Sequence, residues 1–113
     1  MSIFSEIKSV LEPLNIPIES GVFSENPPDE YIVIVPISDT FDLFSDNTPE
    51  VDICEVRLSI FTKNNYLKLK KAVEMLLMKS DFTITARRYV EYEKETGYHH
   101  YAIDTAKSYE TEV

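Results

Sequence analysis

VDICEVRLSIFTKNNYLKLKKAVEMLLM, residues Val51–Met78, decides the fold, because a strand pattern runs directly into a helix pattern. In the first half, apolar side chains occupy every second position, as in a strand with one buried face: Cys54, Val56, Leu58 and Ile60. In the second half, apolar side chains recur at helical spacing: Tyr66, Leu69, Ala72, Val73, Leu76 and Leu77. Asn64 or Asn65 can cap this helix by accepting a backbone N–H. We therefore expect an amphipathic helix that packs on a sheet.

The segments before this unit predict a helix and a strand. The first helix is capped by Ser2 and ends near Glu12, where a proline follows. Residues Asn15–Glu30 form a connector that contains either a short edge strand or a cover for the core. The β-branched run YIVIVPI, Tyr31–Ile37, predicts a strand buried on both faces or at an oligomer seam, and Pro36 marks its end.

The C-terminal region predicts a hairpin that turns at Gly97. With Glu93 opposite Tyr98, the pairing also sets Arg87 opposite Asp104 and Glu91 opposite His100. Arg88 then points inward, either as a charge that keeps the edge strand from pairing with another sheet or as an intersubunit contact. The predicted fold is α+β, with a mixed or antiparallel sheet of four to five strands and two helices packed on one face.

Length and charge narrow the class of protein. The 113 residues fit one domain, 1–113, and the net charge of −9 argues against a surface that wraps nucleic acid. Such acidity either keeps the domain soluble or lets DNA slide past without binding. The single cysteine, Cys54, excludes an internal disulfide and favours a reducing compartment. Without an apolar run of membrane-spanning length or a signal-peptide pattern, we expect a cytoplasmic protein with no membrane partner.

The segment SDTFDLFSDNTPE, residues 38–50, combines aspartates with aromatic residues. It can form a projecting hairpin arm whose aromatics need a partner, or a loop that folds them onto the core. Its candidate interface residues are Phe41, Leu43 and Phe44. Its aspartates are candidates for an acidic lumen or surface: Asp39, Asp42 and Asp46. Their spacing lacks the glycine and the terminal glutamate of a calcium loop.

No arrangement of residues indicates chemistry. His99 and His100 are adjacent in a predicted strand, so they point to opposite faces and cannot share one metal ion. Cys54 has no base to activate it, and a chain with only two glycines lacks a phosphate-binding glycine loop. We therefore assign no catalytic, metal or cofactor-binding residue, and we do not expect an enzyme.

The aromatic residues suggest a surface that partners bury. The chain has seven tyrosines and six phenylalanines, and Tyr89 and Tyr98 are expected to point outward from the hairpin. The alternative is that these aromatics pack within their own sheet.

Three stretches carry a resemblance to a known family: RLSIFTKNNY at Arg57–Tyr66, DFTITARRYVEYEKETG at Asp81–Gly97 and YHHYAIDTAKSYE at Tyr98–Glu110. Across roughly residues 28–110 the chain resembles tail terminator, or tail completion, proteins of tailed phages and prophages of Gram-positive bacteria. The matching stretches are not a catalytic signature.

The resemblance implies a virion protein that acts in head-tail joining at the phage neck. Such proteins form a ring, usually a hexamer, that caps the tail tube and meets the neck connector, while DNA passes without specific binding. Ring contacts need two different complementary patches, for which the candidates are the 38–50 arm and the outer face of the C-terminal hairpin, with Arg88, Tyr89 and Tyr98. Alternatives are a head-tail connector protein, adaptor or stopper, and a small host regulatory or ligand-binding domain.

Overall fold

A computed structural model describes residues 2–21, 26–45 and 48–110. The helices are α1 (Ile3–Leu11), a 3₁₀ turn η1 (Glu12–Leu14) and α2 (Tyr66–Lys79). The strands are β1 (Ile18–Ser20), β2 (Glu30–Ser45), β3 (Thr48–Thr62), β4 (Thr83–Glu93) and β5 (Tyr98–Glu110). They form one sheet in the order β1-β2-β3-β5-β4, in which only β1 is parallel to its neighbour. The α+β fold with a mixed sheet is therefore confirmed.

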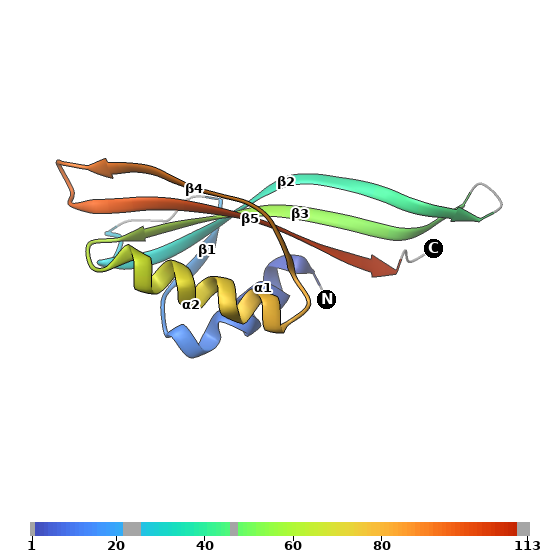
Figure 1. Cartoon of the computed structure of the whole chain (residues 1–113), viewed down its shortest axis with the longest axis horizontal. Coiled ribbons are helices and arrows are strands. Elements are labelled where there is room, and N and C mark those ends of the chain that lie inside the picture. The colour runs from blue at the N-terminus through green and yellow to red at the C-terminus, as the bar shows by residue number, and fades with distance from the viewer. Residues whose placement is uncertain (1, 22–25, 46–47, 111–113) are drawn as a thin grey trace.

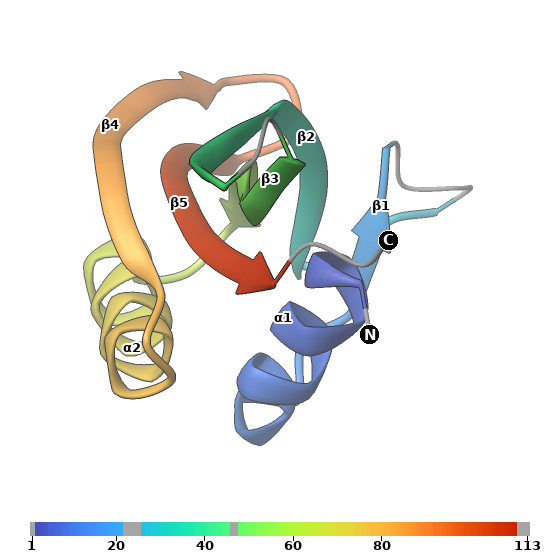
Figure 2. The same ribbon diagram turned by 90° about the vertical axis from the view of Figure 1, so that its right-hand side faces the viewer.

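Both helices lie on the same side of this sheet, α2 beneath β4 and α1 nearer β1 (Figure 2). The β3–α2 unit supplies much of the main core, since Val56, Leu58 and Ile60 face Val73 and Leu77, all at most 2% exposed. Burying each such aliphatic side chain stabilises the fold by about 1.5–3 kcal/mol. Asn65 caps α2 and Ser2 caps α1, so both predicted helix starts are confirmed.

Strand β2 is longer than the sequence predicted. It does not end at Pro36, because a bulge lies between the pairs Pro36–Val56 and Ser38–Glu55, and the strand continues to Ser45. β1 pairs with residues 32–34 of β2 and does not reach Pro36. On this side β2 is an edge strand at Pro36, so the missing backbone N–H of proline breaks no hydrogen bond between strands. Residues 38–45 therefore pair with residues 48–55 of β3 and form the end of a long hairpin.

The C-terminal hairpin follows the predicted register only near its turn. Glu93 pairs with Tyr98 and Glu91 with His100, as predicted. The bulge after Tyr89 then shifts the pairing, so that Arg87 lies opposite Ile103 and not opposite Asp104, and a second bulge follows between Ile84 and Ala86. The expected Arg87–Asp104 pair is thus wrong, because each bulge adds a residue that β5 does not match.

The molecule is elongated, with extents of 55 × 27 × 23 Å. Figure 1 shows why: α1 and α2 cover one end of the sheet, and the hairpin of β2 and β3 runs on beyond them. We call this end the outer sheet, formed by residues 38–45 of β2, 48–55 of β3 and 106–110 of β5. The start of α1 contacts its inner part through Lys107 and Tyr109. The helix-side face of the outer sheet has no helix beneath its far end in the part of the chain that the structure describes.

Candidate interaction surfaces

The helix-side face of the outer sheet carries Phe41, the first candidate interface residue. Phe41 pairs with Asp52 of β3 and is 56% exposed. The side chains of Leu43, Phe44 and Asp42 lie outside what the structure describes, as does Asp46. The described part of the predicted arm therefore presents one large aromatic side chain to solvent.

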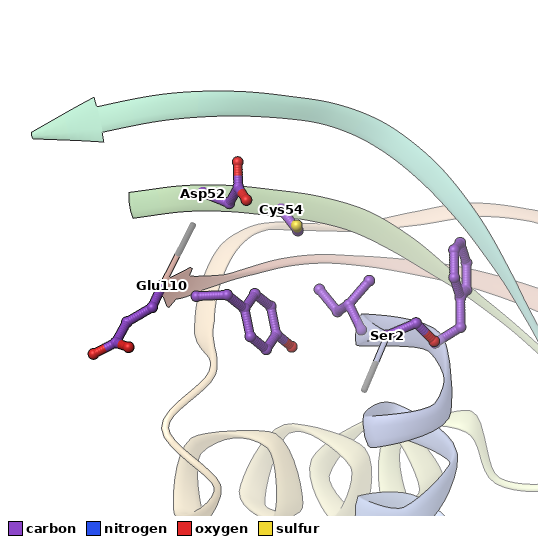
Figure 3. Close-up of a pocket in the computed structure, with 7 residues that line it drawn as sticks. Ser2, Asp52, Cys54 and Glu110 are labelled. Carbon is purple, nitrogen blue, oxygen red and sulfur yellow. The ribbon is translucent and has the colours of Figure 1, made fainter. Parts of the chain in front are cut away.

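A hollow of about 590 Å³ opens between this face and the start of α1. Its walls come from three elements: Ser2, Ile3 and Phe4 at α1, Asp52 and Cys54 of β3, and Tyr109 and Glu110 of β5. We call it the underside hollow. Figure 3 shows Ser2 on one side of it, with Asp52 and Cys54 on the strand above. The lining is mixed, because aromatic and aliphatic side chains lie beside two carboxylates.

The electrostatics of the underside hollow are negative. Burial raises the pKa of the Cys54 thiol to about 11, and a hydrogen bond with Asp39 and the charges of Asp39 and Asp52 add to this shift. A thiol with so high a pKa is almost fully protonated at neutral pH, so Cys54 is a poor nucleophile. Asp39, a candidate for an acidic surface, thus lies on the helix side of the sheet beside Cys54.

A cluster of polar side chains beside the hollow joins α1 to β5. Glu6 accepts hydrogen bonds from Lys107 and, at 2.8 Å, from the Tyr109 hydroxyl. Lys107 also donates to the Ser80 carbonyl at 3.2 Å, which ties α1, β5 and the end of α2 together. Burial alone would raise the pKa of Glu6, but the hydrogen bonds from Lys107 and Tyr109 and the Lys107 charge lower it.

The opposite face of the sheet holds a second, smaller hollow of about 290 Å³. Its lining crosses four strands: Val35, Pro36, Ile37, Arg57, Ser59, Arg88, Val90, His100 and Ala102. Arg57 is held by Asp104 in a two-point ion pair with distances of 2.8 and 3.0 Å. Arg88 is exposed here and pairs in register with Ala102, so it does not point into the core as the sequence predicted. The bulge after Tyr89 puts Arg88 on this face.

Of the outward tyrosines predicted in the hairpin, only Tyr89 is accessible. Tyr98 is 5% exposed, and its hydroxyl donates to the Pro28 carbonyl at 2.6 Å. Its ring packs edge-on against Tyr31 and Phe61 in a second small core, so the expectation that Tyr98 points outward is wrong. Tyr89 is 41% exposed and shares a hydrogen bond with His99.

The two histidines face opposite sides of the sheet. His99 packs against Tyr66 of α2, whereas His100 stacks on Phe61 with ring centroids 4.2 Å apart. Burial lowers the pKa of His100. Within the described ranges, no group of three or more His, Cys, Asp or Glu side chains could hold a metal ion.

The outward face of α2 is a surface that the sequence reasoning missed. It combines apolar and basic side chains, all exposed, which we call the α2 outer stripe: Leu67, Lys68, Lys71, Met75, Met78 and Lys79. Leu67, Met75 and Met78 are 56%, 47% and 54% exposed. One sequence signal for this surface was available. Leu67, Met75 and Met78 lie off the side of the helix that is marked by Leu69, Val73 and Leu77, which are buried and spaced by four residues.

None of the helices in the described ranges has the length and apolarity needed to cross a membrane. A scan against protein-family models finds no family that matches the chain, and a search of curated proteins finds no significant relative.

Proposed function

We propose that this chain is a structural assembly protein of a tailed phage or prophage, which forms a ring at the head-proximal end of the tail tube. The proposal starts from the stretches at residues 57–66, 81–97 and 98–110, which resemble tail terminator proteins. Under it the protein is made in the host cytoplasm and ends in the virion, and its partners are other copies, the tail tube and the neck connector.

The observation that carries the proposal is the outer sheet with Phe41. A lone copy places a 56% exposed aromatic ring on a part of the sheet that neither α1 nor α2 covers. Aromatic residues are enriched where partners meet, so Phe41 is a candidate for burial by a partner, and burying its exposed part would contribute about 1 kcal/mol. The elongated shape supports the same role, because the outer sheet can reach a neighbour without moving the core.

The charge of the chain supports a position around DNA. The net charge of −9 leaves little attraction for phosphates, and Asp39 adds negative charge to the outer sheet. A wall of this kind repels the duplex and so lets it pass without binding.

The test uses purified full-length protein and isolated tail tubes. Wild-type protein should form closed rings at tube ends in negative-stain electron micrographs, and Phe41→Ser should remain folded but form none. Leu67→Ser is the matched control, because Leu67 is also 56% exposed and lies on α2, outside both candidate ring patches. Rings formed equally well by Phe41→Ser would refute the role of this surface.

A deletion of the gene separates the proposed role from that of a connector. Loss of a tail terminator leaves unjoined or overlong tails beside filled heads, whereas loss of an adaptor or stopper leaves heads that leak DNA. Leaking heads with tails of normal length would overturn the proposal in favour of the connector.

A further inference from the structure

The α2 outer stripe and the helix-side face of the outer sheet both leave large apolar side chains exposed, and α2 and the outer sheet lie so that both surfaces face the same side of the molecule (Figures 1 and 2). Four of the exposed large apolar residues belong to them: Phe41 on the sheet, and Leu67, Met75 and Met78 on the helix. Each surface is therefore a candidate for burial by a partner.

The two surfaces have opposite charge. Lys68, Lys71 and Lys79 lie on the α2 outer stripe, and the only acidic residue of α2, Glu74, is buried against Arg87. The outer sheet carries Asp39 beside Cys54, and Asp52 and Glu110 line the underside hollow. Within a chain of net charge −9, this helix face is a concentrated basic surface whose complement lies on the same molecule.

The underside hollow offers a place for apolar side chains of the stripe. It has a volume of about 590 Å³ and lies between the start of α1 and the strands β3 and β5. Methionine side chains adapt to an irregular hollow of this kind.

We propose that two copies pair face to face, with the α2 outer stripe of each copy seated under the outer sheet of the other. In each copy the stripe faces away from its own sheet. A second copy must therefore be rotated by about half a turn before its stripe can face the outer sheet of the first copy. A twofold axis then makes the same contact twice, as in an isologous dimer. A stable interface usually buries about 800 Å² on each partner, and this is the area that the pair has to reach.

This pairing refines the proposed function, because Phe41 lies in the contact. A paired copy offers no free Phe41 to a ring neighbour, so pairing and ring formation exclude each other. The pair would hide the assembly surface until a tube end competes for it.

A charge-swap experiment tests the pair with full-length protein. The sheet variant carries Asp52→Lys and Glu110→Lys, and the helix variant carries Lys71→Glu and Lys79→Glu. Each variant has a control with the same charge change at exposed positions of α1, η1 and the β4–β5 turn: Lys8→Glu with Lys94→Glu for the helix variant, and Glu12→Lys with Glu95→Lys for the sheet variant. Light scattering after size exclusion, over a concentration series at fixed salt, measures the mass and the Kd.

Wild-type and control proteins should form dimers, and the sheet and helix variants should each dimerise at least about tenfold more weakly. Mixing those two variants should restore dimers in a 1:1 ratio, because both contacts of the mixed pair are complementary again. A monomeric wild-type protein, unimpaired single variants or a mixture that stays monomeric would each overturn the pairing. The helix variant keeps Phe41, so ring formation at tube ends is measured separately and either proposal can fail alone.

Discussion

Replacing Lys107 by methionine should lower the free energy of unfolding by about 2 kcal/mol at pH 7. Lys107 donates to Glu6 and to the Ser80 carbonyl, and its Nζ lies 4.7 Å from the centroid of the Phe82 ring. Hydrogen bonds to charged groups contribute about 1.5–3 kcal/mol and exposed cation–π contacts about 0.5–1 kcal/mol. Because Lys107 and Glu6 are still 22% and 20% exposed, we take the lower end of each range.

The effect should depend on pH. The pKa of Glu6 is lowered in the folded protein, so its carboxylate adds stability above the unfolded pKa of about 4.3. That stability is lost as the pH falls from there through the folded pKa. The difference between wild-type and Lys107→Met proteins should therefore shrink below about pH 4.

Urea unfolding followed by far-ultraviolet circular dichroism measures the difference, and the thermal midpoint should fall by roughly 10 °C. Lys8→Met is the matched control. Lys8 is exposed on α1, the helix that carries Glu6, and its replacement should change the free energy of unfolding by less than about 0.5 kcal/mol. A double-mutant cycle with Glu6→Gln isolates the pair. A loss below about 0.5 kcal/mol at pH 7, or an equal loss at pH 3.5, would refute the assigned role of Lys107.

Three further predictions concern single side chains. Asn65 accepts from the backbone N–H groups of Leu67 and Lys68, so Asn65→Ala should cost about 1 kcal/mol in urea unfolding, and an unchanged midpoint would contradict the cap. Burial lowers the pKa of His100, so the fold should lose stability as the pH falls below the unfolded value of about 6.5. Between pH 6.5 and 5, His100→Phe should lose less stability than the wild-type protein, and an equal loss in both proteins would rule out His100 as the cause. With a thiol pKa of about 11, Cys54 should react with iodoacetamide at pH 8 at least about tenfold more slowly in the native than in the urea-unfolded protein, and equal rates would contradict its burial.

Local patterns identified the elements but not their pairing. The alternation at Val56, Leu58 and Ile60 and the caps at Ser2 and Asn65 were correct, because strand faces and helix starts depend on neighbours in the chain. The pairing of Arg87 was wrong, since a bulge shifts every later cross-strand pair and leaves no local signal.

The candidate surfaces also differ in how far the sequence could predict them. Phe41 could be found from its place in an aromatic segment. For the α2 outer stripe only the helical spacing was available, which places Leu67, Met75 and Met78 off the buried stripe but does not show that nothing packs on them. Tyr98 was misjudged for a related reason. The segment that covers it, around Pro28, lies 70 residues away in sequence.

The sequence by itself determined the class of fold, the β3–α2 unit and the acidity of the chain, because periodicity, capping and net charge are properties of short segments or of composition. Only the tertiary structure decided that both helices cover one end of the sheet, and that Phe41 therefore lies uncovered while Tyr98 is buried. The physical reason is that exposure depends on which distant segment packs over a side chain. The same packing places the acidic outer sheet and the basic stripe of α2 on one side of the molecule.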